Sequence, residues 1–135
     1  MLPQIIPKPE QQEELCALQA RWLIHPDLAQ RLAQMAKELP YPLQIISGWR
    51  SSETQASLMA EPDSTAASED RSTHRTCPAT GADVWTPTVT PVAAVKAAVG
   101  AAAMRAGLRW GGGGPVDLST GIPKDWNHVD LGPRR

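Results

Sequence analysis

The residues best suited to chemistry in this chain are its three histidines, His25, His74 and His128. His25 stands at an expected helix start, where we interpret it as an exposed cap. The other two lie near carboxylates, because Asp83 follows His74 and Asp125 comes three residues before His128. Neutral imidazoles and carboxylates are the groups that bind catalytic zinc together with a water molecule. These two segments are therefore the candidates for a metal site.

Such a site needs two or three protein ligands and one open position for water. Bound zinc lowers the pKa of that water to about 7. A carboxylate beside the metal can then take the proton and later give it to a leaving amine. Asp125 is placed for this role, because a turn could aim both it and His128 at one cavity. Judged by spacing alone, these histidines and aspartates could also occur together by chance. The hypothesis requires the imidazoles of His74 and His128 to lie within about 5 Å of each other.

Further short motifs surround these residues. In chain order they are Ser47-Gly48-Trp49-Arg50-Ser51, Ser72-Thr73-His74, Gly81-Ala82-Asp83-Val84, Gly111-Gly112 and Asp125-Trp126-Asn127-His128. This order resembles the zinc peptidases of the D-alanyl-D-alanine carboxypeptidase and dipeptidase group. Their superfamily includes phage endolysins and the hedgehog signalling domain. The resemblance covers residues 43–131 and implies an α+β fold of the hedgehog/DD-peptidase type.

The resemblance also implies a role for each matching residue. Zinc would be held by His74, Asp83 and His128, and Asp125 would act as general base and general acid. Arg50 would face the scissile carbonyl and stabilise its developing negative charge, an effect of about 3 to 4 kcal/mol for comparable donors.

Two more residues receive a substrate-binding role. Ser72 would orient the substrate or the first metal ligand, and Trp126 could line the cleft. Core packing is the alternative for Trp126. A surface ion pair is the alternative for Arg50. Asp130 follows His128 by two residues and is either a partner of that histidine or a solvated strand end.

The spacing between His74 and Asp83 is nine residues, whereas the family usually has seven. An insertion of two residues before Gly81 would explain the difference. Cys77 lies in this stretch, and His-x-x-Cys is an acceptable spacing for zinc ligands. A site of His74, Cys77 and His128, more structural in character, is therefore an alternative. In a third interpretation Cys77 is a plain loop thiol.

Composition narrows the class of protein. The chain has 135 residues, of which 41% are apolar and 20% charged, as in a globular domain. A formal net charge of −1 provides no basic field for nucleic acid or an anionic membrane. Its two cysteines cannot form a disulfide scaffold. The start, MLPQIIPKPEQQEE, lacks the pattern of a secretory signal. We therefore expect synthesis in a cytoplasm. Together with the missing signal, the resemblance implies a phage or prophage origin with delivery to the cell wall, and we expect a monomer.

Periodicity predicts one α+β domain over residues 1–135 with a small antiparallel sheet. An extended arm (1–10) and N-terminal helices (11–39) precede a catalytic core (43–131). Strands are predicted at 43–49, 81–86, 108–110 and 127–131. A short helix is expected from Ser51 or Ser52 to Met59. A longer helix should begin with Thr90 as its cap and Pro91 as its first residue, and end near Gly107.

The resemblance therefore implies a zinc-dependent peptidase that cleaves stem or cross-link peptides of peptidoglycan. Two alternatives belong to other classes of protein. One is a module that binds zinc but has lost turnover, and the other is a metal-free virion structural or assembly protein.

Overall fold

A computed structural model describes residues 4–5, 22–61, 72–75 and 77–132. Its helices are α2 (Pro26–Glu38), α3 (Ser52–Met59), α4 (Ala93–Arg105) and the short 3-10 helix η1 (Gly111–Gly113). Its strands are β1 (Gln4–Ile5), β2 (Gln44–Ser47), β3 (Gly81–Trp85), β4 (Arg109–Trp110) and β5 (His128–Asp130). The strands form one antiparallel sheet in the order β1-β2-β3-β5-β4. This architecture confirms the predicted α+β class.

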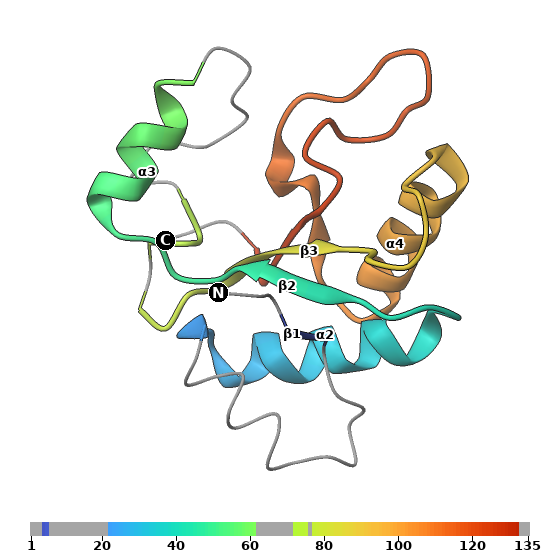
Figure 1. The fold of residues 1–135 in the computed structure, drawn as a ribbon, viewed down its shortest axis with the longest axis horizontal. Coiled ribbons are helices and arrows are strands. Elements are labelled where there is room, and N and C mark those ends of the chain that lie inside the picture. Colours follow the sequence, from blue (N-terminus) through green and yellow to red (C-terminus); the bar gives the residue numbers. More distant parts are fainter. Residues whose placement is uncertain (1–3, 6–21, 62–71, 76, 133–135) are drawn as a thin grey trace.

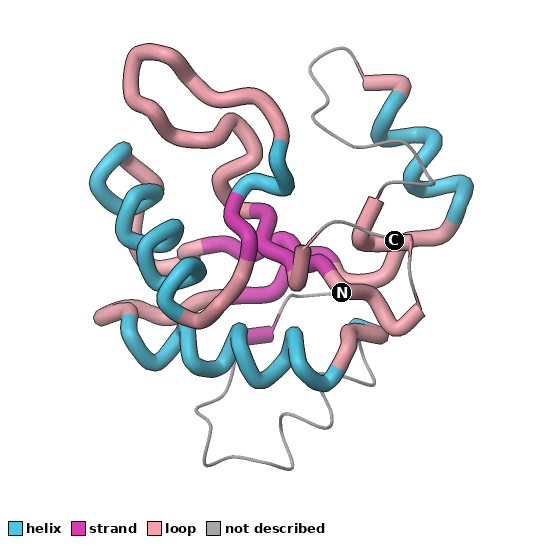
Figure 2. Tube along the Cα trace, turned by 180° about the vertical axis from the view of Figure 1, so that it is seen from behind, coloured by secondary structure: helices cyan, strands magenta, loops and turns pink. Residues whose placement is uncertain are grey.

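Different elements cover the two sides of the sheet. Helix α2 runs along one side of β2 and β3, and α4 packs against α2 and β4 (Figure 1). On the other side rise α3 and the long connection between η1 and β5, as both Figure 1 and the reverse view in Figure 2 show. Within the described residues, none of the helices is both long and apolar enough to span a bilayer.

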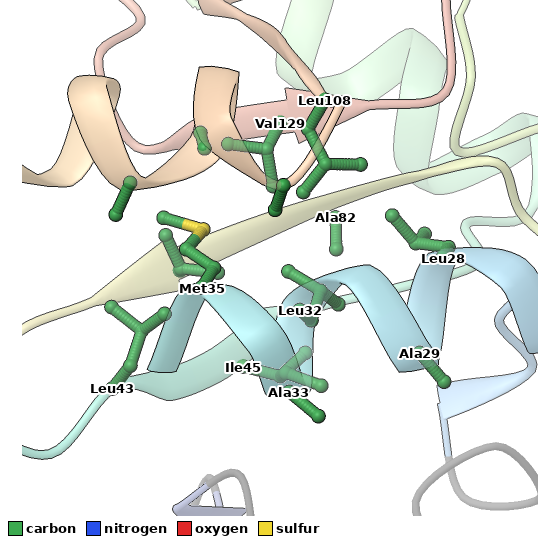
Figure 3. Close-up of a cluster of buried hydrophobic side chains, with 14 of the residues drawn as sticks. Leu28, Ala29, Leu32, Ala33, Met35, Leu43, Ile45, Ala82, Leu108 and Val129 are labelled. Atoms are coloured by element: carbon green, nitrogen blue, oxygen red, sulfur yellow. The ribbon is translucent and has the colours of Figure 1, made fainter. Parts of the chain in front are cut away.

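The hydrophobic core lies between α2, α4 and one face of the sheet. Helix α2 places its buried side chains there at spacings of three and four residues, which is the pattern of one helical face. In Figure 3, Leu28, Leu32 and Met35 of this helix point towards the strand that runs above it. Core members labelled in that view are Leu28, Ala29, Leu32, Ala33, Met35, Leu43, Ile45, Ala82, Leu108 and Val129. This packing fixes the sheet against the helices.

The starts of two helices follow the predicted capping chemistry. The Nδ1 atom of His25 accepts a hydrogen bond from the backbone N–H of Asp27 at 3.1 Å, with Pro26 in the first turn. The hydroxyl oxygen of Ser51 accepts from the backbone N–H of Thr54 at 3.2 Å. Both contacts satisfy N–H groups that have no partner inside a helix. The predicted role of His25 as a cap is therefore confirmed.

Helix α4 begins later than the sequence predicted. Thr90 and Pro91 precede it, and the cap is Val92, whose extended backbone offers no side-chain hydrogen bond. The prediction was wrong because the carbonyl oxygen of Thr90 bonds the N–H of Val92 at 2.8 Å, which closes a turn before the helix. The end is as expected, since Gly107 follows with a φ of 78°, a conformation that favours glycine.

The N-terminal predictions fall mostly outside the described residues. Residues 6–21, which include most of the predicted first helix, are among them. Of the predicted arm over residues 1–10, the structure describes Gln4 and Ile5, which pair with β2. A strand at this point was not predicted from the sequence.

Strand alternation gives the sheet two chemically different faces. In β3, Ala82 and Val84 are buried in the core, so Asp83 points to the opposite face. In β5, Val129 is buried in the core, so His128 points away from it. The register places Asp83 directly across from His128. The fold thereby brings together two polar residues that are 45 positions apart in the chain.

Candidate metal centre

Three predicted ligands meet on the open face of the sheet. The Nε2 atom of His74 lies 3.2 Å from Nδ1 of His128. Oδ1 of Asp83 lies 3.4 Å from the His74 atom and 3.2 Å from the His128 atom. Zinc bonds of about 2.0 to 2.1 Å in a tetrahedron require ligand separations of about 3.3 to 3.4 Å. The triangle has the dimensions of one face of such a tetrahedron, so the group could hold a metal ion.

The outer hydrogen bonds of both imidazoles leave the inner nitrogens as acceptors. Nδ1 of His74 lies 2.6 Å from the carbonyl oxygen of Gly48. Nε2 of His128 lies 2.8 Å from a carboxylate oxygen of Asp130. Because carbonyl and carboxylate oxygens only accept, each outer nitrogen must carry the hydrogen. In neutral rings the two inner nitrogens and the Asp83 oxygen are then three converging acceptors. Only a proton or a cation between them relieves that arrangement, and this chemistry fits a metal.

Charge in the metal-free site follows from the same contacts. Burial would raise the pKa of Asp83, but its close contacts with His128 and His74 outweigh that effect and hold this pKa well below its usual range. Burial would lower the pKa of His128, but hydrogen bonds to Asp130 and Asp83 raise it to about 9. The pKa of Asp130 is lowered despite its burial, because His128 and Arg109 both donate to it. Without metal, the site therefore holds a proton on His128 near neutral pH.

His74 is positioned by a turn at the end of the segment 72–75. The hydroxyl oxygen of Ser72 accepts from the backbone N–H of His74 at 3.3 Å. The backbone N–H of Arg50 donates to the carbonyl oxygen of His74 at 2.8 Å. Ser72 is buried and contacts the ligand loop, as one of its two predicted roles would require. Its predicted contact with substrate stays a prediction.

The long spacing between His74 and Asp83 is accommodated by a turn that is tied to the segment before α2. The backbone N–H of Ala79 donates to the carbonyl oxygen of Leu23 at 2.7 Å, and the N–H of His25 donates to the carbonyl oxygen of Ala79 at 2.8 Å. The chain then enters β3 in the register that faces Asp83 towards His128. The spacing of nine residues therefore still allows the three ligand atoms to converge.

Cys77 lies within this turn and is exposed. Among the residues that the structure describes, it does not belong to the group whose ligand atoms converge, and Asp83 takes the third place. The geometry therefore favours the set with aspartate over the predicted alternative with a thiolate.

Two glycines allow close approach to the imidazole of His128. A Cβ atom at Gly81 would lie 2.0 Å from Oγ1 of Thr73 and 3.0 Å from Cε1 of His128, which no side chain could tolerate. A Cβ atom at Gly112 would lie 3.1 Å from Cδ2 of His128. The glycine run after β4 thus brings its backbone against the ring.

Arg50 is bound to the candidate ligand Asp83. Its Nη2 donates to Oδ2 of Asp83 at 2.5 Å, Nη1 donates to Oε1 of Gln55 at 3.1 Å, and Nε donates to Oγ of Ser47 at 3.2 Å. Arg50 thereby leaves Oδ1 of Asp83 turned towards the histidines. The alternative of a surface ion pair is wrong, because both side chains are less than 15% exposed, at 12% and 14%. Its predicted role at a substrate carbonyl stays a prediction.

Asp125 and Trp126 occupy the connection before β5. The carbonyl oxygen of Asp125 accepts from the N–H of His128 at 3.0 Å, so the predicted turn between them exists. The Asp125 side chain is half-buried. Trp126 is buried, with its ring 5.4 Å from that of Trp85 and 5.6 Å from the ammonium of Lys96. Its place in the core agrees with the packing alternative.

A groove of about 490 Å³ begins at Asp83 and Arg50 and runs between β2 and α3. Its wall is mainly apolar, and Arg75 lies over the ring of Trp49 at 5.7 Å. Other lining residues are Trp22, Ile46, Ser47, Gly48, Ser51, Thr54 and Leu58. Sequence reasoning assigned no role to Trp49, although it lies inside the motif around Arg50. Nor did it assign one to Trp22 and Leu58.

The fold is similar to that of a characterised enzyme. The crystal structure of the L-Ala D-Glu endopeptidase ChiX from Serratia marcescens matches with a TM-score of 0.58 and 22% sequence identity. The match covers 92% of this chain and 87% of that one. No family model matches the sequence, and no curated protein does. At this identity the likeness shows the fold alone, and it agrees with the predicted α+β fold class.

Proposed function

We propose that this protein is a zinc-dependent peptidase that hydrolyses stem or cross-link peptides of peptidoglycan. The observation that carries the proposal is the triangle of His74, Asp83 and His128, with separations of 3.2 to 3.4 Å. Support for the reaction comes from the fold, which an L-Ala D-Glu endopeptidase shares. Two imidazoles with one carboxylate form a ligand set typical of catalytic zinc, which leaves the fourth position for water or substrate.

In this proposal the bound metal supplies Lewis-acid polarisation and an acidic water. The residues of the chain supply the rest. Asp125 accepts a proton from the attacking water and returns it to the leaving amine. Arg50 fixes Asp83 and places a positive charge where the groove meets the three ligands, close to the oxygen that gains negative charge. The groove beside Trp49 holds one side of the peptide.

The experiment is amine release from purified peptidoglycan by the zinc-loaded protein. Asp125→Asn should lower the rate by about a hundredfold while zinc content stays at one equivalent, because only proton transfer is lost. His74→Ala should abolish both zinc binding and amine release. A matched control is Asp117→Asn, a change of the same type in the exposed part of the same connection, where Asp117 bonds Ser119. It should leave the rate unchanged.

The proposal fails if the loaded wild-type protein releases no new amines from any wall peptide. One equivalent of zinc without turnover would then favour the binding module. Zinc below about a tenth of an equivalent would favour the metal-free structural protein. If Asp125→Asn strips the metal, the general-base assignment is wrong.

A further inference from the structure

We infer that Asp130 and Arg109 are a positioning pair that fixes the imidazole of His128 for metal binding. The inference rests on the proposed function only through the metal site and does not require turnover. Asp130 is fully buried, with 0% of its side chain exposed, and its Oδ2 lies 2.8 Å from Nε2 of His128. Asp130 contacts His128 at Nε2, on the side of the ring opposite the Nδ1 atom that faces His74 and Asp83.

The carboxylate of Asp130 is held by donors that do not involve His128. Arg109 donates to it twice, from Nε to Oδ1 at 2.9 Å and from Nη2 to Oδ2 at 2.8 Å. The backbone N–H of Gly132 donates to Oδ1 at 2.8 Å. Three donors thus set the carboxylate in place, and a bidentate arginine fork restricts its rotation as a single charge would not. The fourth contact is then free to orient the imidazole.

Strand geometry explains why these residues meet. His128 and Asp130 are separated by two positions on β5 and therefore share a face of the sheet. Arg109 lies directly across from Asp130 in the register between β4 and β5, so it shares that face as well. The same arrangement excludes the predicted alternative of a solvated strand end for Asp130. A hydrogen-bonded outer partner of this kind typically accounts for a 10- to 100-fold effect on metal affinity.

The two histidines differ in how they are anchored. The outer nitrogen of His74 bonds a backbone carbonyl oxygen, that of Gly48, which no substitution removes. The outer nitrogen of His128 bonds a side chain, which a substitution can change. Asp130→Asn keeps the volume but has only one accepting oxygen. Because both oxygens of Asp130 accept from N–H donors, the amide must turn its NH₂ group towards either His128 or Arg109.

The test is zinc affinity of the folded full-length chain, measured by competition with a chromophoric chelator. Asp130→Asn should weaken zinc binding 10- to 100-fold. Arg109→Gln should weaken it as well, by several-fold up to about tenfold. This second variant is the sharper one, because loss of a positive charge near a cation site would by itself tighten zinc binding. It also covers the case in which Asp130→Asn does not fold.

A matched control is Arg105→Gln, which makes the same charge change on α4. Arg105 pairs with Glu38 at the surface, at 2.8 Å. Its zinc affinity should equal that of the wild type. The positioning inference is overturned if Arg109→Gln binds zinc as tightly as the wild type or more tightly. It is also overturned if Arg105→Gln weakens binding to the same extent, since the effect would then be one of charge or general stability.

A spectroscopic readout separates positioning from a merely structural role. In the zinc-loaded wild type, the ring N–H of His128 at Nε2 should appear in NMR spectra as a slowly exchanging proton. Asp130→Asn should speed its exchange, and the Nδ1–H proton of His74 serves as the internal reference. Unchanged exchange at both rings in a folded Asp130→Asn protein would overturn the inference. Failure of the wild type to hydrolyse peptidoglycan would instead concern only the proposed function.

Discussion

The two faces of the central sheet are stabilised by different interactions. On the core face, Val84 and Val129 are fully buried and contact apolar groups from α2 and α4. On the other face, Asp83, His128 and Asp130 are held by mutual hydrogen bonds. Adjacent positions on the same two strands therefore serve stability on one side and binding on the other. The converging acceptors on the polar face require a bound cation or proton between them, whereas the apolar side chains on the core face do not.

The largest effect on stability is expected from a cavity on the core side of the sheet. Leu32 of α2 is fully buried, so Leu32→Ala should lower the free energy of unfolding by about 2 to 5 kcal/mol. The zinc affinity of the folded fraction should not change, because no ligand contacts this position. Urea unfolding and chelator competition measure the two quantities. A variant with weakened zinc binding and near-normal stability would show that the faces are not separable.

On the polar face, removal of one metal ligand should affect the part of the stability that depends on zinc. In the wild type, free zinc at about 100 times its Kd should raise the free energy of unfolding by about 2.7 kcal/mol. His74→Ala should lose this zinc-dependent increment, since one of three ligands is missing. Thermal or urea unfolding with zinc and with EDTA gives the difference. An equal zinc effect in His74→Ala and wild type would place the metal elsewhere.

The stability of the metal-free protein should depend on pH through the polar face. The pKa of His128 is about 9 in the folded chain and near 6.5 when unfolded, so folding takes up a proton between these values. This contribution is complete below about pH 6.5 and is lost as the pH rises through 9. Stability in EDTA should fall by an amount on the order of 2 kcal/mol over that window. Urea unfolding at pH 6 to 9 measures it, and a flat profile would contradict the proton-holding site.

The smallest effect is expected at the surface. Arg105 and Glu38 join α4 to α2 through an ion pair whose side chains are 59% and 40% exposed. Arg105→Ala should change the free energy of unfolding by less than about 1 kcal/mol, because water and salt screen such pairs. It should leave zinc affinity unaffected. A larger loss in urea unfolding would mean that the contact between the two helices depends on this pair.

Much of the fold could be predicted from local signals. Helices were predicted over residues 11–39, and α2 lies within that range. The start of α3 was predicted at Ser51 or Ser52, and Ser51 caps it. The start of α4 was misplaced, since a turn at Thr90 competes with the capping pattern. Strand β1 was missed because two residues carry no periodicity, and its pairing with β2 depends on tertiary contacts.

The site was predictable to the extent that residue type reports chemistry. The histidines and Asp83 were named from motif order, and the structure brings them together. The place of Asp130 was left open, although its spacing from His128 was noted. Arg109 was not recognised at all, because its contact depends on the register between β4 and β5, which no local pattern specifies. The groove beside Trp49 likewise arises only when β2 and α3 are packed.

The most direct test of the central claim is X-ray absorption at the zinc edge of the loaded protein. We expect one equivalent of zinc bound by two imidazole nitrogens and carboxylate or water oxygens at about 2.0 to 2.2 Å, with no sulfur. A zinc–sulfur distance of about 2.3 Å would contradict it, since Cys77 would then be a ligand in place of Asp83. So would a protein that retains no zinc.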